Sequence, residues 1–256
     1  MTPVRVDVPT ATRAPTDTTA AYVVDGQPGL LVDPAARTDR LDEAVADHTV
    51  GAVAVTHHHP DHVGAVADYA RAFGLTVYAR RGRTQAFVAA TGVEPDRTFG
   101  PGTTLPGSGV EVLDTPGHAP EHTAFVTPAG ILTGDLAVAE GSVVVGAPEG
   151  DVRAYLSSLR RVVARDPDRL FPAHGPTIDD PRATCERLIG HRLRRERRVR
   201  EAVRGGARTV EEILDAAYEK DLSGVTDLAR ATVVAHLEKL AVEGAVTWDG
   251  DRTPAA

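Results

Sequence analysis

The 256-residue sequence is 42% hydrophobic and 25% charged, a globular composition with enough apolar material for a sizeable core. Its formal net charge of −8 argues against a protein coated in basic charge for nucleic acid. The single Cys185 excludes an intramolecular disulfide and fits a reducing compartment. We expect a cytoplasmic protein without a membrane partner, because the first residues lack a signal-peptide core and no run approaches the ~20 apolar residues of a membrane span.

Most of the chain alternates between strand-like and helix-like segments, as judged from hydrophobic period and from Gly and Pro punctuation. The strands and helices predicted before residue 80 span 20–24, 29–33, 52–56 and 75–79 (strands) and 40–47 and 61–73 (helices). The strands predicted after residue 100, and the helix among them, span 110–115, 122–127, 130–135, 142–146 and 168–174 (strands) and 152–165 (helix). This order predicts an α/β (α+β) fold of two sheets with helices on the outside.

The pattern changes near residue 180, where the strand signals stop. We predict an arginine-rich helix over 182–204, two further helices over 210–220 and 226–242, and a short hairpin over 244–253. Thr209 and Glu212 form a capping-box pattern at the start of the second of these helices. We therefore expect two domains, residues 1–180 and a small winged-helix-like domain at residues 181–256.

The heptapeptide THHHPDH, residues 56–62, places four histidines and an aspartate directly after the apolar run GAVAV. It lies where a predicted strand passes into a predicted helix, so His57 and His59, as alternate residues of a loop, can converge on one ion. Asp61 and His62 open the helix and can face a second ion nearby. Imidazole nitrogens and carboxylate oxygens are ligands that suit zinc.

Three more candidate ligands follow downstream, each just after an apolar strand-like run. They occur in the motifs DTPGH, LTGDL and FPAHG and are His118, Asp135 and His174. The ends of strands in an α/β fold commonly line up along one edge, where functional sites are built. The sequence therefore predicts that these three residues join the heptapeptide in one metal site.

In this order, H-x-H-x-D-H, TPGH, GD and a late His after a strand resemble the metallo-β-lactamase fold superfamily of metal-dependent hydrolases. The resemblance implies a four-layer αβ/βα sandwich with a two-metal site at its edge. The first metal would be held by His57, His59 and His118, and the second by Asp61, His62 and His174. Asp135 would bridge the two metals. Asp33 matches a position that supports such a site from behind the ligands.

Two divalent cations ~3.5–4 Å apart can share a hydroxide, and zinc lowers the pKa of its bound water to about 7. The resemblance therefore implies a hydrolase that uses a metal-bridging hydroxide on two Zn²⁺, with Mn²⁺ or Fe²⁺ as alternatives. Asp61 and Asp135 are the catalytic candidates, and Asp61 can orient the nucleophile or take its proton. The diiron branch of the superfamily carries Glu at the position of His59 and is disfavoured, whereas the mononuclear-iron sulfur dioxygenases keep the same motif.

Four other residues are candidates for a supporting or substrate-facing role: Asp33, His122, His191 and Arg194. His58 alternates with the neighbouring ligands, so we expect it to point away from the metals. His122 follows TPGH closely and is a candidate for the substrate pocket. The arginine-rich helix, HRLRRERRVREAVR, has two interpretations: a solvated face of i, i+4 ion pairs, or a basic strip beside the metals that attracts an anionic substrate.

This helix and the later motif AHLEKLAVEG resemble one branch of the superfamily, the beta-lactamase-like protein 2 group, whose animal members are single-strand endoribonucleases. Three functions follow as hypotheses: a phosphodiesterase for single-stranded RNA or another anionic substrate, a thioester or acyl hydrolase like the hydroxyacylglutathione hydrolases, and a non-enzymatic nucleic-acid-binding regulator. Double-stranded DNA is disfavoured, because the candidate recognition helix over 226–242 is poor in phosphate-binding cations. A homodimer is a further expectation.

Overall fold

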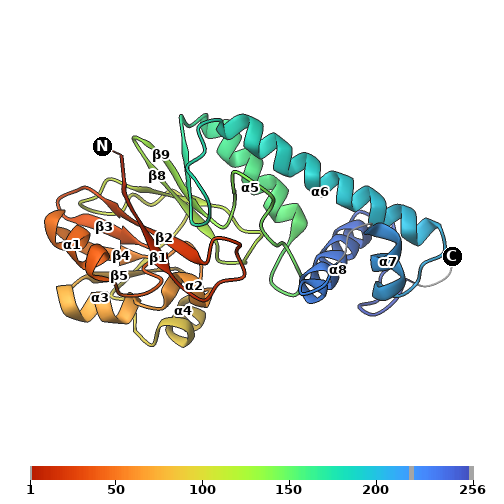
Figure 1. The fold of residues 1–256 in the computed structure, drawn as a ribbon, viewed down its shortest axis with the longest axis horizontal. Helices are drawn as coiled ribbons and strands as arrows, with labels where there is room; N and C mark the ends of the chain where they lie inside the picture. Colours follow the sequence, from red (N-terminus) through yellow and green to blue (C-terminus); the bar gives the residue numbers. More distant parts are fainter. Residues whose placement is uncertain (1, 219–221, 254–256) are drawn as a thin grey trace.

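The computed structural model describes residues 2–218 and 222–253. An α/β body carries a long helix, α6 (Pro181–Arg204), which leads away from it to two shorter helices, α7 (Val210–Ala217) and α8 (Thr226–Val242) (Figure 1). The body contains the residues for which the sequence predicts a metal site. The three helices form the region for which it predicts an appendage.

The first sheet follows the order of the chain, from β1 to β6. Its strands are β1 (Val4–Pro9), β2 (Thr18–Val24), β3 (Gly29–Val32), β4 (Val50–Ala54), β5 (Thr76–Arg80) and β6 (Arg97–Phe99). The first three strands pair antiparallel, whereas β3 to β6 are parallel because helices return the chain between them. These helices are α1 (Asp39–Asp47), α2 (Pro60–Val63), α3 (Val66–Phe73) and α4 (Thr84–Thr91).

The second sheet has the order β10-β9-β8-β7. Its strands are β7 (Glu111–Asp114), β8 (Thr123–Thr127), β9 (Gly130–Gly134) and β10 (Leu170–Pro172). The first three of these form an antiparallel meander, and β10 returns parallel to β9 after the helix α5 (Val152–Arg165). The carboxylate of Asp151 caps α5 by accepting hydrogen bonds from two backbone N–H groups of its first turn.

Alternating side chains on the strands separate the body into four layers. On β2, Ala21 and Val23 pack with the helices outside the first sheet, whereas Tyr22 packs between the two sheets. On the second sheet, Phe125 and Leu132 face this same central layer, while their chain neighbours pack against α5. The order helix, sheet, sheet, helix confirms the predicted αβ/βα sandwich.

The strand predicted at residues 142–146 is wrong, since this segment is an irregular part of the connection between β9 and α5. Val143 and Val145 are buried, so the apolar alternation correctly indicated burial. However, the carbonyl groups of Val143 and Val144 accept hydrogen bonds from the side chains of Arg192 and His118, not from a neighbouring strand. Side-chain donors thus satisfy the backbone that a sheet would otherwise satisfy.

The single helix predicted over 61–73 is broken into α2 and α3, at Gly64 and Ala65. The chain passes so close to its neighbour here that a Cβ on Gly64 would lie 2.3 Å from the carbonyl oxygen of Ala35. The break leaves α2 as one short turn, which carries two of the predicted ligands into the site. Three elements, β1, α4 and β6, were not predicted from the sequence.

The C-terminal helices share an apolar core formed by Val199, Ile213, Leu214, Ala217, Ala229, Val233, Leu237 and Leu240. The predicted capping box is present at the start of α7, where Thr209 and Glu212 each bond the other's backbone N–H. Within the described residues the predicted hairpin over 244–253 forms no strands, and Thr209 pairs with Arg252 in an isolated bridge. Residues 219 and 220, the predicted end of the second helix, lie outside the described residues.

Helix α6 runs without a break from the body to the C-terminal core. Cys185 and Leu188 pack in the layer between α5 and the second sheet, whereas Val199 lies in the C-terminal core. Burial raises the pKa of the Cys185 thiol to about 12, so this thiol stays protonated at neutral pH and serves as a packing group. Of the helices that the structure describes, none combines the length and apolar character needed to cross a bilayer.

His236 on α8 is fully buried, and neither ring nitrogen has a hydrogen-bond partner among the described residues. Burial, with the charges of nearby arginines and Lys239, lowers its pKa from 6.5 to about 3. The unfolded chain therefore binds a proton that the folded state rejects, so stability is full above pH 6.5 and falls as the pH falls toward 3. Below pH 6, we expect the unfolding free energy of His236→Leu, measured by urea titration, to fall less steeply with falling pH than that of the wild type. The difference between the two slopes should be about 1.4 kcal/mol per pH unit.

Only the slope against pH tests this assignment, because the leucine also changes the packing around α8. His122 and His191 keep part of the acid sensitivity in the variant, since burial lowers their pKa values to about 3 and about 4. Unfolding free energies that fall equally steeply in both proteins contradict the assignment.

Candidate metal centre

The seven predicted ligands lie just beyond the ends of four strands. The strands and the ligands that follow them are β4 with His57, His59, Asp61 and His62, β7 with His118, β9 with Asp135, and β10 with His174. Their ligand atoms form three overlapping groups, and within each group the atoms lie within 4.8 Å of one another. The structure therefore brings all seven to one edge of the sandwich.

Three histidines make the first group, His57, His59 and His118. His57 and His118 face the group through Nε2, and each of these atoms lies 3.0 Å from Nδ1 of His59. The other ring nitrogen of His59 points outward and lies 3.1 Å from a carboxylate oxygen of Glu149. The side chain of His59 is 33% exposed, so this is the ligand of the first group that solvent reaches most easily.

Asp61, His62 and His174 make the second group, and Asp135 lies between the two groups. Oδ1 of Asp135 is 3.6 Å from Nε2 of His62 and 3.4 Å from Nε2 of His174. Its other oxygen, Oδ2, is 3.6 Å from Nε2 of His118 in the first group. Asp135 thus offers one oxygen to each side, which is the arrangement that a bridging carboxylate needs.

Backbone carbonyl groups set the tautomers of two ligands. Nδ1 of His118 donates to the carbonyl oxygen of Val144 at 2.7 Å, and Nδ1 of His174 donates to that of Thr18 at 2.9 Å. A carbonyl oxygen only accepts, so Nδ1 carries the proton in both rings. Both histidines therefore present an Nε2 lone pair to the site, as hydrogen bonds made behind a metal ligand commonly ensure.

Asp33 sets the tautomers of two others. Its buried carboxylate accepts hydrogen bonds from the backbone N–H of Thr56 at 2.7 Å, from the Thr56 hydroxyl at 2.7 Å and from Nδ1 of His62 at 3.0 Å. Because the Thr56 hydroxyl spends its proton on Asp33, it accepts from Nδ1 of His57 at 3.1 Å. Asp33 has a positive φ of 52°, a conformation that Asp and Asn adopt more readily than most residues.

The donor set fits divalent cations. Nε2 of His57 and Nε2 of His118 each face Nδ1 of His59 at 3.0 Å, and the lone pairs of these nitrogens need a cation, or a proton on His59, among them. Nε2 of His62 and Oδ1 of Asp135 are buried without a hydrogen-bond partner among the described residues. Nitrogen and carboxylate donors in this mixture suit zinc, iron or manganese.

The protonation of these groups also fits metal binding. Burial lowers the pKa of His57 and His118, which are therefore neutral at pH 7. Burial would lower the pKa of His62 as well, but the carboxylates around it outweigh this effect and raise the pKa to about 9. Burial would raise the pKa of Asp135, but the neighbouring histidines outweigh it and lower the pKa. A cation at Nε2 of His62 competes with a proton there, so we expect metal affinity to fall as the pH falls.

A family model described as the Metallo-beta-lactamase superfamily matches residues 14–174, a span that contains all seven ligand positions. The chain belongs to the metallo-beta-lactamase superfamily. It is a hydrolase of this superfamily, with a His/Asp cluster that can hold metal ions.

Relatives and solved structures extend the match beyond this span. A beta-lactamase-like protein 2 homolog from Drosophila melanogaster is 28% identical over 212 residues, which are 77% of this chain and 70% of the relative. An atrochrysone carboxyl ACP thioesterase from Aspergillus chevalieri is 31% identical over 197 residues, 70% of this chain and 59% of that protein. A crystal structure of a metallo-beta-lactamase family protein from Thermus thermophilus shares the fold, with a TM-score of 0.77 at 24% identity over 98% of this chain and 97% of that chain.

Two further histidines of the superfamily domain lie beside the metal ligands. His58 points away from them, with its ring against Phe87 and its backbone N–H donating to Glu121. His122 is fully buried, and burial lowers its pKa to about 3. Its Nδ1 bonds the hydroxyl of Thr115 and its Nε2 accepts from the backbone N–H of Asp135. His122 therefore supports Asp135 from behind, which is one of its two predicted roles, and it does not line the cavity described next.

A cavity of about 630 Å³ opens beside the metal-ligand edge of the superfamily domain. Five of the ligands lie in its wall, His59, Asp61, His118, Asp135 and His174. The rest of the wall comes from residues 11–16 between β1 and β2, Pro60, residues 138–144 after β9, residues 175–176 and Leu228 of α8. The volume falls in the range of typical small-ligand sites, ~300–1,000 Å³.

Two predicted pocket residues, His191 and Arg194, do not line this cavity. His191 is half-buried on α6 and lies 3.4 Å from the hydroxyl of Ser142, which is itself part of the wall. Arg194 is exposed on the same helix. His191 thus stands behind the wall, and the prediction that Arg194 faces the substrate is not supported by its place in the fold.

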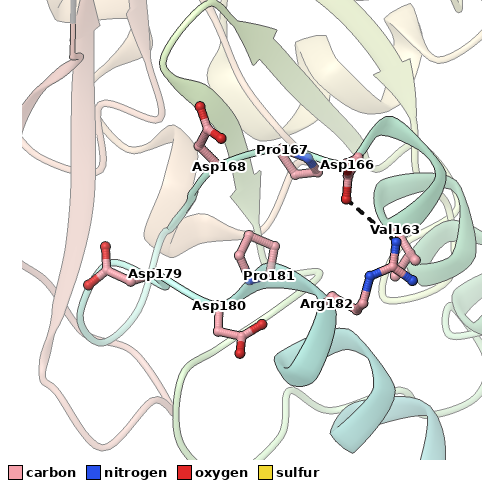
Figure 2. A pocket seen from close by; sticks show the side chains of 8 residues that line it. All are labelled: Val163, Asp166, Pro167, Asp168, Asp179, Asp180, Pro181 and Arg182. Carbon is pink, nitrogen blue, oxygen red and sulfur yellow. Dashed lines mark hydrogen bonds and ion pairs between the residues drawn. The ribbon is translucent and has the colours of Figure 1, made fainter.

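A second, smaller cavity of about 220 Å³ lies where α5 ends and α6 begins, and four aspartates surround it (Figure 2). Asp166 pairs with Arg182 at 3.5 Å, and Asp179 pairs with Arg169 at 3.0 Å. Asp180 caps α6. These contacts account for three of the four aspartates as structural groups, and the fourth, Asp168, is exposed. The cavity beside the metal ligands is therefore the candidate functional site.

Several contributors to the site carry no signal in the sequence. The carbonyl groups of Val144 and Thr18 orient two ligands, but every residue has a carbonyl group. Thr56 links Asp33 to His57 through its hydroxyl group. The only sequence feature that pointed to this role is its position directly before the first histidine of THHHPDH. Glu149 reaches His59 across 90 residues of chain, which no local pattern reveals.

Proposed function

We propose that the protein is a dinuclear metal hydrolase for an acyl compound, a thioester or ester with an apolar acyl group. The apolar wall of the cavity beside the ligands carries this proposal. Val138, Ala139, Val143, Val144 and Leu228 line it. Apolar surface of this kind gains free energy by covering a hydrocarbon group and offers little to a strongly hydrated polyanion.

The charges around the cavity support the same substrate class. Arg13 is its single cationic side chain apart from the histidines, among the described residues, and its guanidinium is already paired with Asp227 of α8 at 3.1 Å. Asp61, Asp135 and Glu140 bring carboxylates to the same wall. Single-stranded RNA binds through repeated phosphate contacts with Lys and Arg, and this wall lacks the cations for such contacts.

The ligand groups assign roles to the chain's own residues. His57, His59 and His118 would hold one divalent cation, and the second group would hold another, with Asp135 between them. Bound there, two such cations supply Lewis-acid polarisation of the substrate and activation of water at neutral pH. Asp61 is both a ligand candidate and part of the cavity wall, so its carboxylate can orient water toward the acyl carbon or accept its proton.

The alternative of an anionic substrate has weaker support. It depended on arginines of α6 facing the metals, but residues of this helix do not line the described cavity wall. The thioesterase from Aspergillus chevalieri, in contrast, is a relative whose name states acyl hydrolysis. We therefore place thioesters and esters first and phosphodiesters second.

Metal-loaded protein assayed side by side on p-nitrophenyl esters of increasing chain length, S-acyl-glutathiones, a bis-aryl phosphate and single-stranded RNA tests this order. We expect kcat/KM for the esters to rise about threefold to fourfold per added methylene until the cavity is full, because each buried methylene is worth about 0.8 kcal/mol. The phosphodiesters should be the poorer substrates. Faster turnover of the bis-aryl phosphate or of RNA than of every ester and thioester would reverse the proposal.

A further inference from the structure

Residues 138–144 form the largest continuous part of the cavity wall, and all seven of them line it. They belong to no strand or helix, so no ladder of backbone hydrogen bonds fixes their shape. Irregular segments of this kind are usually mobile unless other groups tie them down. The contacts that hold this wall therefore decide the shape of the cavity.

Two arginines of α6 supply these contacts. The guanidinium of Arg187 donates to three carbonyl oxygens, those of Val138 at 2.7 Å, Ala139 at 3.0 Å and Gly141 at 2.6 Å. Arg192, five residues further along the helix, donates to the carbonyl oxygen of Val143. A guanidinium has five N–H donors in a fixed plane, so one side chain can replace part of a missing strand.

The same wall leads directly to a metal ligand. The residue after Val143 is Val144, whose carbonyl oxygen accepts the Nδ1–H of His118 at 2.7 Å. A shift of this carbonyl would release the proton that keeps Nε2 of His118 available to a cation. Arg192, Val143, Val144 and His118 thus form a continuous path from α6 to the first ligand group.

The environment of Arg192 argues that this contact has a specific role. Its side chain is 3% exposed, its guanidinium bonds the Val143 carbonyl, and the guanidinium carbon lies 5.4 Å from the centroid of the Tyr155 ring. A buried cation that no carboxylate of the described residues pairs with costs free energy, and an apolar residue could fill the same space at lower cost. We therefore attribute the presence of this cation to its hydrogen bond with Val143, which holds the loop in place.

We propose that Arg187 and Arg192 are positioning residues. Arg187 fixes residues 138–141 of the cavity wall, and Arg192 fixes residues 143–144 and, through them, His118. The part of this inference about the substrate cavity rests on the proposed function. The part about His118 depends on metal binding alone. It gives the arginine-rich helix a role that differs from both a solvated face and an electrostatic attraction of substrate.

Arg187 is exposed, so Arg187→Met removes its three hydrogen bonds without opening a hole in the core. We expect cleavage after the exposed Glu140 by a glutamate-specific protease to become about tenfold faster or more, because losing three hydrogen bonds makes local opening of residues 138–144 more frequent. KM for the longer esters should rise by a similar factor while kcat and metal content stay within twofold. Arg187→Lys should restore part of the loss, and Arg197→Met, exposed further along α6, is the matched control.

Arg192→Lys tests the role of Arg192 in fixing residues 143–144. We expect its metal affinity to fall by about 10- to 100-fold, the usual cost of disturbing a group behind a ligand. Cleavage after Glu140 that is as slow in Arg187→Met as in Arg197→Met overturns the inference, and so does a loosened loop with an unchanged KM for the longer esters. If the wild-type protein hydrolyses none of the esters, the proposed function fails, but proteolysis and metal affinity still decide whether the arginines position the loop and His118.

Discussion

Asp135→Asn is expected to lower turnover by about 10³-fold or more, which corresponds to about 4 kcal/mol of transition-state stabilisation. One oxygen of the Asp135 carboxylate faces each ligand group, at 3.4–3.6 Å from the nearest histidine nitrogens. An asparagine of the same size keeps one oxygen and turns an NH₂ group, a donor that cannot bind a cation, toward the other side. Steady-state kinetics of metal-reconstituted protein, with elemental analysis for zinc, iron and manganese, measures both effects.

Elemental analysis should give about two metal ions per wild-type chain and at most one in Asp135→Asn. Glu140→Gln is the matched control, because Glu140 lines the same cavity and is absent from the ligand groups. It should keep both metals and most of the activity. Wild-type turnover in Asp135→Asn, with an unchanged circular dichroism spectrum, would place the catalytic centre elsewhere.

Asp33→Asn is the second substitution for which a large effect is expected, although residue 33 touches no metal. The carboxylate accepts the Nδ1–H of His62, so it holds the ring with Nε2 free for a cation. The asparagine can still accept from the N–H of Thr56, but its NH₂ group then faces the Thr56 hydroxyl and His62. The His62 ring is expected to accept from this NH₂ through Nδ1 and to carry its proton on Nε2, the tautomer that cannot bind a metal.

We expect Asp33→Asn to lose the metal of the second group and about 10- to 100-fold in activity. Asparagine tolerates the positive φ of this position, so the backbone should be retained. Asp7→Asn, an exposed change on β1 that removes one ion pair with Arg5, is the control for the loss of a charge. A variant that keeps two metals and full activity would show that Asp33 stabilises the fold without setting the His62 tautomer.

The ligands could be predicted from the sequence because their positions combine two kinds of information. The heptapeptide places four of them next to one another, and each of the others, His118, Asp135 and His174, follows an apolar strand. Strand ends meet at one edge in a sandwich of this kind, so local patterns were enough to predict a long-range cluster. The alternation of strands and helices predicted two sheets with helices on the outside, and the resemblance to the superfamily implied the four-layer order.

What the sequence could not predict depends on side chains that bond the backbone. Residues 142–146 have the apolar alternation of a strand, but Arg192 and His118 take the carbonyl groups that a neighbouring strand would need. One interpretation of the arginine-rich helix was a surface for anions, whereas Arg187 and Arg192 donate to backbone carbonyl groups of the segment after β9. A pattern of polar and apolar residues indicates which side chains are buried, but it does not indicate which carbonyl group a given arginine will reach.

The cavity draws its reactive groups and its apolar wall from separate stretches of the chain. The ligands stand at strand ends of the sandwich, whereas residues 138–144 and Leu228 belong to a connecting segment and to the C-terminal helices. Side-chain changes at Val138, Ala139 and Leu228 can enlarge, narrow or reshape the cavity without touching a metal ligand, whereas Val143 and Val144 are tied to His118. Such a division lets a lineage explore new substrates by drift in part of the wall while its chemistry is preserved. In the laboratory, libraries confined to Val138, Ala139 and Leu228 should change substrate range at little risk to the metal site.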